Sequence, residues 1–157
     1  MQGLRMGEPM SFAALLTWMI TAGAGLYLLT IWLIEYDREF QSAAATRLPV
    51  PVISAHALLA VAGLLVWVVY LITDTPRLAL AAAATLIVVA ALGLTMAVRW
   101  VRVYRAHDSA AVRGERAGIT VPPERNFPLP VVIGHGLFAG ATIVLVVLTA
   151  LGEAGGS

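Results

Sequence analysis

Charged residues divide this chain into four long uncharged stretches, each of 21 to 27 residues. The charged residues that bound them are Glu8 and Glu35, Arg47 and Asp74, Arg77 and Arg99, and Arg125 and Glu153. A bilayer core about 30 Å thick needs roughly 20 apolar residues in a helix, so each stretch is long enough for one span. The stretches lack the alternation of polar and apolar residues that membrane strands show. The sequence therefore predicts four transmembrane helices, near Phe12–Ile34, Pro51–Thr73, Leu78–Val98 and Pro130–Leu151.

Composition agrees with this prediction. Of 157 residues, 60% are hydrophobic and only 12% are charged, whereas soluble domains have about 45–50% apolar and about 25% charged residues. This excludes an ordinary soluble protein, a disordered chain and a nucleic-acid binder that uses a basic patch. The absence of cysteine excludes disulfides, iron–sulfur clusters and thiolate metal sites. We expect an all-α integral membrane protein, with residues 1–157 forming a single four-helix bundle in contact with lipid.

Arginine is distributed unequally between the two ends of the predicted bundle. Eight of the ten arginines lie between the first two spans or in the loop at about residues 99–129, and only Arg5 and Arg77 lie on the other side. The positive-inside rule then places these two loops in the cytoplasm and both termini outside. All basic residues are arginine, and Ala, Val, Leu and Gly are abundant, which indicates a bacterial gene of high G+C content. We expect a multi-pass protein of the bacterial inner (cytoplasmic) membrane.

The long loop has two interpretations. Arg99, Arg102 and Arg105 share one helical face and would continue the third helix into the headgroup region. They could contact the phosphates of an anionic leaflet, or they could form a docking surface for a cytoplasmic partner. His107 lies among Arg and Asp residues and is expected to be solvated.

Two parts of the sequence are repeated. Residues 48–60 align without gaps on residues 127–139, with six of thirteen positions identical and a shared Pro-x-Pro-Val-x-x-x-His pattern. A looser match, Gly-Leu followed by Trp and Tyr at equal spacings, comprises Gly25, Leu26, Trp32 and Tyr36 in one copy and Gly93, Leu94, Trp100 and Tyr104 in the other. The repeated unit is thus two helices, residues 12–73 and 78–151. Units with an even number of spans insert the same way up, which predicts a pseudo-two-fold axis along the membrane normal.

Histidine is the residue of the repeat that suggests chemistry. His56 and His135 each lie five residues inside the opening proline of their helix, so both should be about 7–8 Å below the cytoplasmic end. The second and fourth helices of a sequential bundle are diagonal across its core. Two imidazoles at one depth can supply both axial ligands of a haem, with each ring nitrogen about 2 Å from the iron.

The surroundings of the two histidines fit this hypothesis. Small residues beside and beneath them would leave a slot for a flat macrocycle; the candidates are Ala60, Gly63, Gly134, Gly136 and Ala139. Arg47 and Arg125 precede the two histidines by nine and ten residues. Arginine at the cytoplasmic boundary is suited to pair with the propionates of a b-type haem.

This arrangement resembles that of cytochrome b, in which a four-helix bundle holds b-haem between histidines on its second and fourth helices. It is also similar to the one-haem anchor subunits of membrane dehydrogenases. One histidine per helix suffices for one haem and not for a transmembrane pair. The resemblance implies an electron-transfer subunit of a larger respiratory or quinone-linked complex, with quinone as an exchange partner.

Other functions remain open at this point. Both histidines could be purely structural hydrogen-bonders between helices of a non-catalytic accessory subunit in a membrane complex. A bare copper or zinc ion would need further ligands, and no Met, Asp or Glu lies on the same turns. A transporter or channel is disfavoured because no charged side chain lies within a span. No nucleophile–base pair occurs, so any enzymatic chemistry would belong to a cofactor or a partner chain.

Overall fold

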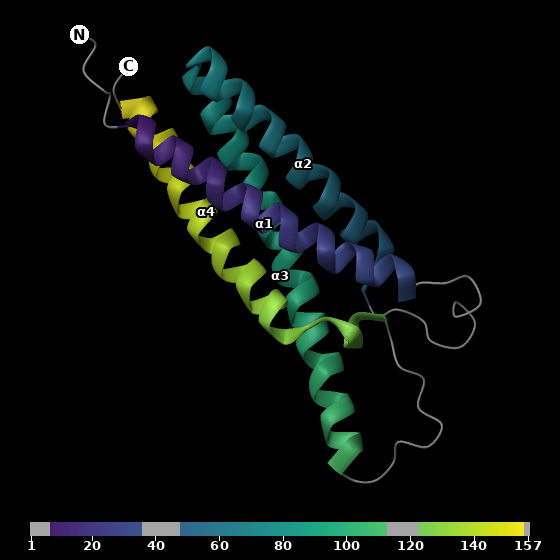
Figure 1. Cartoon of the computed structure of the whole chain (residues 1–157). Helices are drawn as coiled ribbons and strands as arrows, with labels where there is room; N and C mark the ends of the chain where they lie inside the picture. The colour runs from purple at the N-terminus through teal and green to yellow at the C-terminus, as the bar shows by residue number, and fades with distance from the viewer. Residues whose placement is uncertain (1–6, 36–47, 113–122, 156–157) are drawn as a thin grey trace.

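The fold consists of four long helices. The computed structural model describes residues 7–35, 48–112 and 123–155, and Arg47 lies outside these ranges. The described elements are α1 (Gly7–Glu35), α2 (Val50–Thr73), α3 (Pro76–Val112), the short 3-10 helix η2 (Pro123–Asn126) and α4 (Leu129–Gly155) (Figure 1). All four α-helices are long and apolar enough to cross a membrane. The prediction of an all-α membrane protein with four spans is confirmed.

The helices α2 and α4 begin in the same way. Pro49 and Pro128 stand before them, and each carbonyl accepts backbone hydrogen bonds from the residues three and four positions later, at 2.9 to 3.1 Å. A second proline, Pro51 or Pro130, follows inside the first turn. A proline there is inexpensive because the N–H that it lacks would have no partner within the helix. The shared Pro-x-Pro pattern is therefore explained by helix initiation alone.

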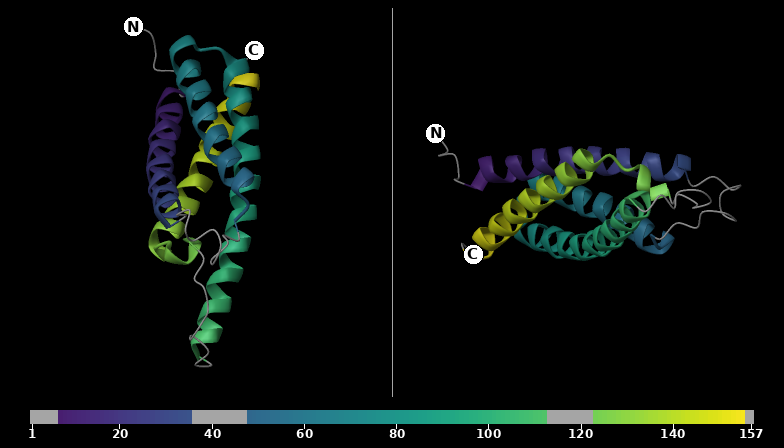
Figure 2. Two further views of the ribbon diagram at one scale, coloured as in Figure 1. Left: turned by 90° about the vertical axis from the view of Figure 1, so that its right-hand side faces the viewer. Right: turned by 90° about the horizontal axis from the view of Figure 1, so that it is seen from below.

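The helix α3 extends well beyond its predicted membrane span. Its predicted span ends at Val98, and the expected helical continuation through Arg99, Arg102 and Arg105 is present and extends to Val112. No glycine or proline occurs between Leu94 and Arg113, and nothing in this stretch interrupts the helix. Figures 1 and 2 show the last turns of α3 projecting beyond the rest of the bundle.

The helices form a ring in which neighbours along the chain are also neighbours in space. The largest contacts are those of α1 with α4 and of α2 with α3, and smaller ones join α3 to α4 and α1 to α2. The helices α2 and α4 consequently lie across the diagonal of the bundle, as expected. The start of α1 and the end of α4 lie at one end of the bundle, which we call the terminal end; the starts of α2 and α4 lie at the opposite, loop end (Figure 1).

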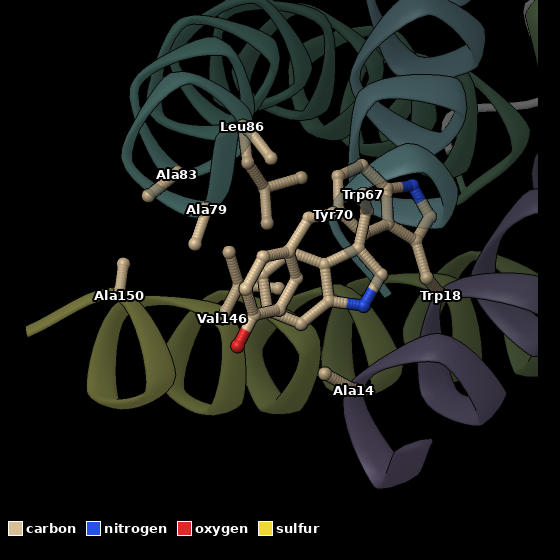
Figure 3. Packing of buried hydrophobic residues seen from close by; sticks show 10 residues of the cluster. Ala14, Trp18, Trp67, Tyr70, Ala79, Ala83, Leu86, Val146 and Ala150 are labelled. Carbon is tan, nitrogen blue, oxygen red and sulfur yellow. The ribbon is translucent and has the colours of Figure 1, made fainter. Parts of the chain in front are cut away.

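The main apolar core fills the terminal end. Figure 3 shows Trp18, Trp67 and Tyr70 packed between α3 and α4 residues such as Leu86 and Val146. The indole N–H of Trp67 donates to the backbone carbonyl of Ser11 at 3.3 Å, and the hydroxyl of Tyr70 donates to Glu153 Oε1 at 3.3 Å. A smaller cluster of Trp32, Leu48 and Ile53 lies at the loop end. The polar atoms of Trp67 and Tyr70 thus have partners inside the bundle, as burial in lipid requires.

The buried positions follow the spacing of the sequence repeat. Adding 68 to the buried positions of α1 gives buried positions of α3; the pairs are Ser11 and Ala79, Ala14 and Ala82, Trp18 and Leu86, and Trp32 and Trp100. Adding 79 relates α2 to α4 through the pairs Gly63 and Thr142, Trp67 and Val146, and Tyr70 and Thr149. The agreement is partial, since Val103 is buried and its counterpart Glu35 is exposed. A rotation that superposes the two halves remains a prediction of the repeat.

Candidate functional site

The structure brings the two predicted histidines together. His56 and His135 are each the seventh residue of their helix, since α2 begins at Val50 and α4 at Leu129. Both side chains are half-buried. Their ring centroids are 6.4 Å apart and the ring planes make an angle of 61°. The expectation that α2 and α4 present one imidazole each, at one depth, agrees with this geometry.

Each imidazole bonds to the backbone of a neighbouring helix. Nδ1 of His56 lies 3.0 Å from the carbonyl oxygen of Val89 on α3, and Nδ1 of His135 lies 3.0 Å from that of Thr21 on α1. A carbonyl oxygen only accepts, so Nδ1 carries the proton and donates. In a neutral imidazole Nε2 is then the nitrogen with the free lone pair. Both rings consequently hold the tautomer that is suited to bind a metal through Nε2.

Two glycines allow these hydrogen bonds to form. Gly25 lies one turn beyond Thr21, and a Cβ added to it would be 3.0 Å from Cε1 of His135. Gly93 lies one turn beyond Val89, and a Cβ there would be 3.1 Å from Cε1 of His56. A side chain at Gly25 would push the His135 ring away from the carbonyl oxygen of Thr21, and one at Gly93 would push the His56 ring away from that of Val89.

The sequence analysis missed this role of Gly25 and Gly93. Both glycines belong to the looser match of the repeat, but the pattern gave them no partner. The available signal was their spacing of 68 residues, which Thr21 and Val89 share. The two histidine contacts are thus equivalent by sequence position as well as by geometry.

The predicted small residues do not all lie beside the histidine pair. Ala60 and Ala139 are half-buried, one turn deeper than the histidines. Gly63, one turn further, packs against Trp18 and Thr85, which would lie 3.2 Å from an added Cβ. The indole of Trp18 fills the space at this level, so a slot beneath the histidines cannot extend to Gly63.

The glycines that flank His135 have few neighbours. A Cβ at Gly134 or Gly136 would meet no other atom within 4 Å. Gly134 is half-buried, whereas Gly136 is exposed on the outer side of α4. The structure therefore places Gly136 toward lipid, contrary to its expected place beside a slot, because the backbone turns it away from the bundle axis.

Arg125 lies at the loop end of the bundle, in η2. Its guanidinium carbon is 4.4 Å from the ring centroid of Tyr104, in a cation–π contact. The indole N–H of Trp100 donates to the carbonyl oxygen of the buried Glu124 at 3.1 Å. These contacts hold η2 against α3 immediately before α4 begins. Its predicted counterpart, Arg47, lies outside the described residues.

The described residues provide two imidazoles at this position and no larger group of metal-ligating side chains. Among the described residues there is no group of three or more His, Cys, Asp or Glu side chains that could hold an ion. Zinc and copper sites in proteins usually take three or four protein ligands. A haem needs only two protein ligands, because its porphyrin supplies the other four. The pair of histidines fits that need.

Comparisons with known proteins found no matching family model, no similar curated protein and no similar solved structure. The functional assignment therefore depends on the geometry of the histidine pair.

Proposed function

We propose that this protein is a b-type haem-binding electron-transfer subunit of a larger respiratory or quinone-linked membrane complex, with His56 and His135 as the two axial ligands. One observation carries the proposal. Two imidazoles from diagonal helices approach to 6.4 Å between ring centroids, and each donates its Nδ1 proton to a backbone carbonyl.

The separation of the rings suits a shared iron. Two imidazoles that held one haem iron between them would have ring centres about 6 Å apart, and the ring centroids of His56 and His135 are 6.4 Å apart. The bond from Nδ1 to a carbonyl fixes the orientation of the ring and raises the basicity of Nε2, as for most metal-ligating histidines. Gly25 and Gly93 provide the close approach on which both bonds depend.

The chain's own residues would have a limited set of tasks. A bound haem would act as a one-electron carrier. His56 and His135 would hold it, Thr21 and Val89 would orient the two rings through their carbonyl oxygens, and the surrounding apolar helices would exclude water. Because the pair lies near the loop end only, electrons would be exchanged with quinone or a partner subunit on that side.

The orientation in the membrane forms part of this proposal. Eight of ten arginines lie in the sequence between α1 and α2 or between residue 99 and the start of α4, so we propose that the loop end faces the bacterial cytoplasm and that both termini face outward. A reporter enzyme that works only outside the cytoplasm is fused after Ser157. This fusion is expected to be active. The same reporter inserted between residues 113 and 122 is expected to be inactive. The reverse pattern would contradict the orientation.

An absorption spectrum of the purified protein tests the assignment. The reduced-minus-oxidised spectrum is expected to show the Soret and α bands of a low-spin b-type haem. The protein should be extracted in a mild detergent, so that a complex with partner subunits is retained. A folded protein in its native complex without a Soret band would contradict the proposal.

A second function is favoured by the same hydrogen bonds. Each imidazole already links two helices, His56 joining α2 to α3 and His135 joining α4 to α1. Hydrogen bonds of this kind stabilise membrane bundles by about 0.6 kcal/mol on average. A non-catalytic accessory subunit would need nothing more from these residues. The two functions differ in their prediction for Nε2, which binds iron in the first and has no required ligand in the second.

A further inference from the structure

We propose that the exposed face of α3 formed by Arg99, Arg102 and Arg105, the arginine face, binds the headgroups of anionic phospholipids. This inference concerns a surface and not the histidine pair, so it goes beyond the proposed function. The leaflet concerned is the one at the loop end of the bundle. Neither haem nor a particular orientation of the termini is needed for it.

The arginine face begins where the apolar part of α3 ends. Residues 78–98 carry no charge, and the three arginines follow at positions i, i+3 and i+6. All three side chains are exposed. Six residues of α-helix rise about 9 Å, whereas the headgroup layer on each side of a bilayer is about 5–8 Å thick. The arginines therefore coincide with the level of the lipid phosphates.

The opposite face of this part of α3 is covered by the chain itself. Trp100 and Val103 are buried, and Tyr104 is half-buried beneath Arg125. At 100° per residue, Trp100 and Tyr104 point about 160° away from Arg102 at the centre of the arginine face, and Val103 points about 100° away. The segment that returns through η2 thus packs on the aromatic side and leaves the arginine side exposed.

The arginine face continues a side of α3 that is exposed to the membrane interior. Ile87, Leu94 and Val98 are 57%, 66% and 44% exposed, and on a helical projection they lie within about 80° of Arg102. Apolar side chains exposed within a span are available for contact with acyl chains. Since headgroups lie directly above acyl chains, the occupant of the arginine face is lipid. An acidic protein would have to displace the headgroups at this level.

Lipid binding by the full chain in detergent micelles tests this proposal. The affinity for dioleoylphosphatidylglycerol and for dioleoylphosphatidylcholine is measured by titration and native mass spectrometry. An arginine near an anionic lipid surface contributes about fivefold in affinity. The Arg102→Gln/Arg105→Gln double variant is therefore expected to lose about 25-fold in affinity for phosphatidylglycerol. Its affinity for phosphatidylcholine should be unchanged.

Two further variants serve as controls. Arg77→Gln removes an exposed arginine at the other end of the same helix and is expected to retain the preference for phosphatidylglycerol. Arg102→Lys/Arg105→Lys keeps both charges and is also expected to retain it. Circular dichroism verifies that the variants have the helical content of the wild type.

Three outcomes would overturn the proposal. The wild type could bind the two lipids equally, as expected if this surface meets an acidic protein. The double Gln variant could retain the full preference. Glycerol 3-phosphate could compete as well as the lipid does, which would indicate a site for free phosphate. None of these outcomes depends on haem, so failure here is distinguishable from failure of the proposed function.

Discussion

The His56→Ala and His135→Ala variants are each expected to lose the low-spin haem spectrum completely while retaining four inserted helices. Removal of either imidazole leaves one axial position without its ligand, and six-coordinate bis-imidazole iron cannot form. The apolar spans are otherwise unchanged, so insertion should persist. Spectra of the purified variants, together with protease protection of the membrane-embedded helices, measure the two effects separately.

The third histidine provides the control for these variants. His107 lies beyond the apolar part of α3 in the sequence, and His107→Ala is expected to leave the spectrum unchanged. If His56→Ala or His135→Ala kept the wild-type spectrum, the shared site would be excluded. If the wild type had no haem spectrum and the variants only melted at lower temperature, the histidines would be structural links between helices.

The Gly25→Val and Gly93→Val variants should displace His135 and His56 respectively. The nearest ring atom would lie 3.0 or 3.1 Å from the new Cβ, and the two further methyl groups of valine increase the conflict. Overpacking of a tight interior position typically costs about 1–3 kcal/mol. We expect loss of the bond from Nδ1 to the carbonyl, a lower melting temperature and weaker haem retention, measured by thermal melting and by haem transfer to an acceptor protein.

The matched controls lie on the same helices or their neighbours. A Cβ at Gly23 on α1 or at Gly140 on α4 would meet no other atom within 4 Å. The Gly23→Val and Gly140→Val variants are therefore expected to behave as the wild type. Equal effects at Gly23 and Gly25 would show that valine acts through the helix backbone, and the specific contact with His135 would be refuted.

The sequence predicted the features that depend on composition and spacing. The four spans follow from uncharged stretches of sufficient length, because a charged side chain is costly in the bilayer core. The approach of His56 to His135 was expected because the repeated pattern gave them the same depth on diagonal helices. Such expectations need only the geometry of a helix and not the details of packing.

Features that depend on side-chain packing could not be predicted in this way. Gly63 and Ala60 appear equally small in the sequence, but only the structure shows that Trp18 covers Gly63. Gly25 and Gly93 gained a role only when the rings of the histidines were seen against them. The continuation of α3 beyond Val98 was expected as far as Arg105, because Arg99, Arg102 and Arg105 share one helical face, but the end of the helix at Val112 was not predicted.

The central claim is that His56 and His135 together hold one haem, and the haem content of the purified wild-type chain tests it most directly. Haem is extracted and quantified against protein in the same sample that gives the reduced-minus-oxidised spectrum. The account predicts one low-spin b-type haem per chain. A correctly folded chain in its native complex with no haem, or with one haem for every two chains, would contradict it.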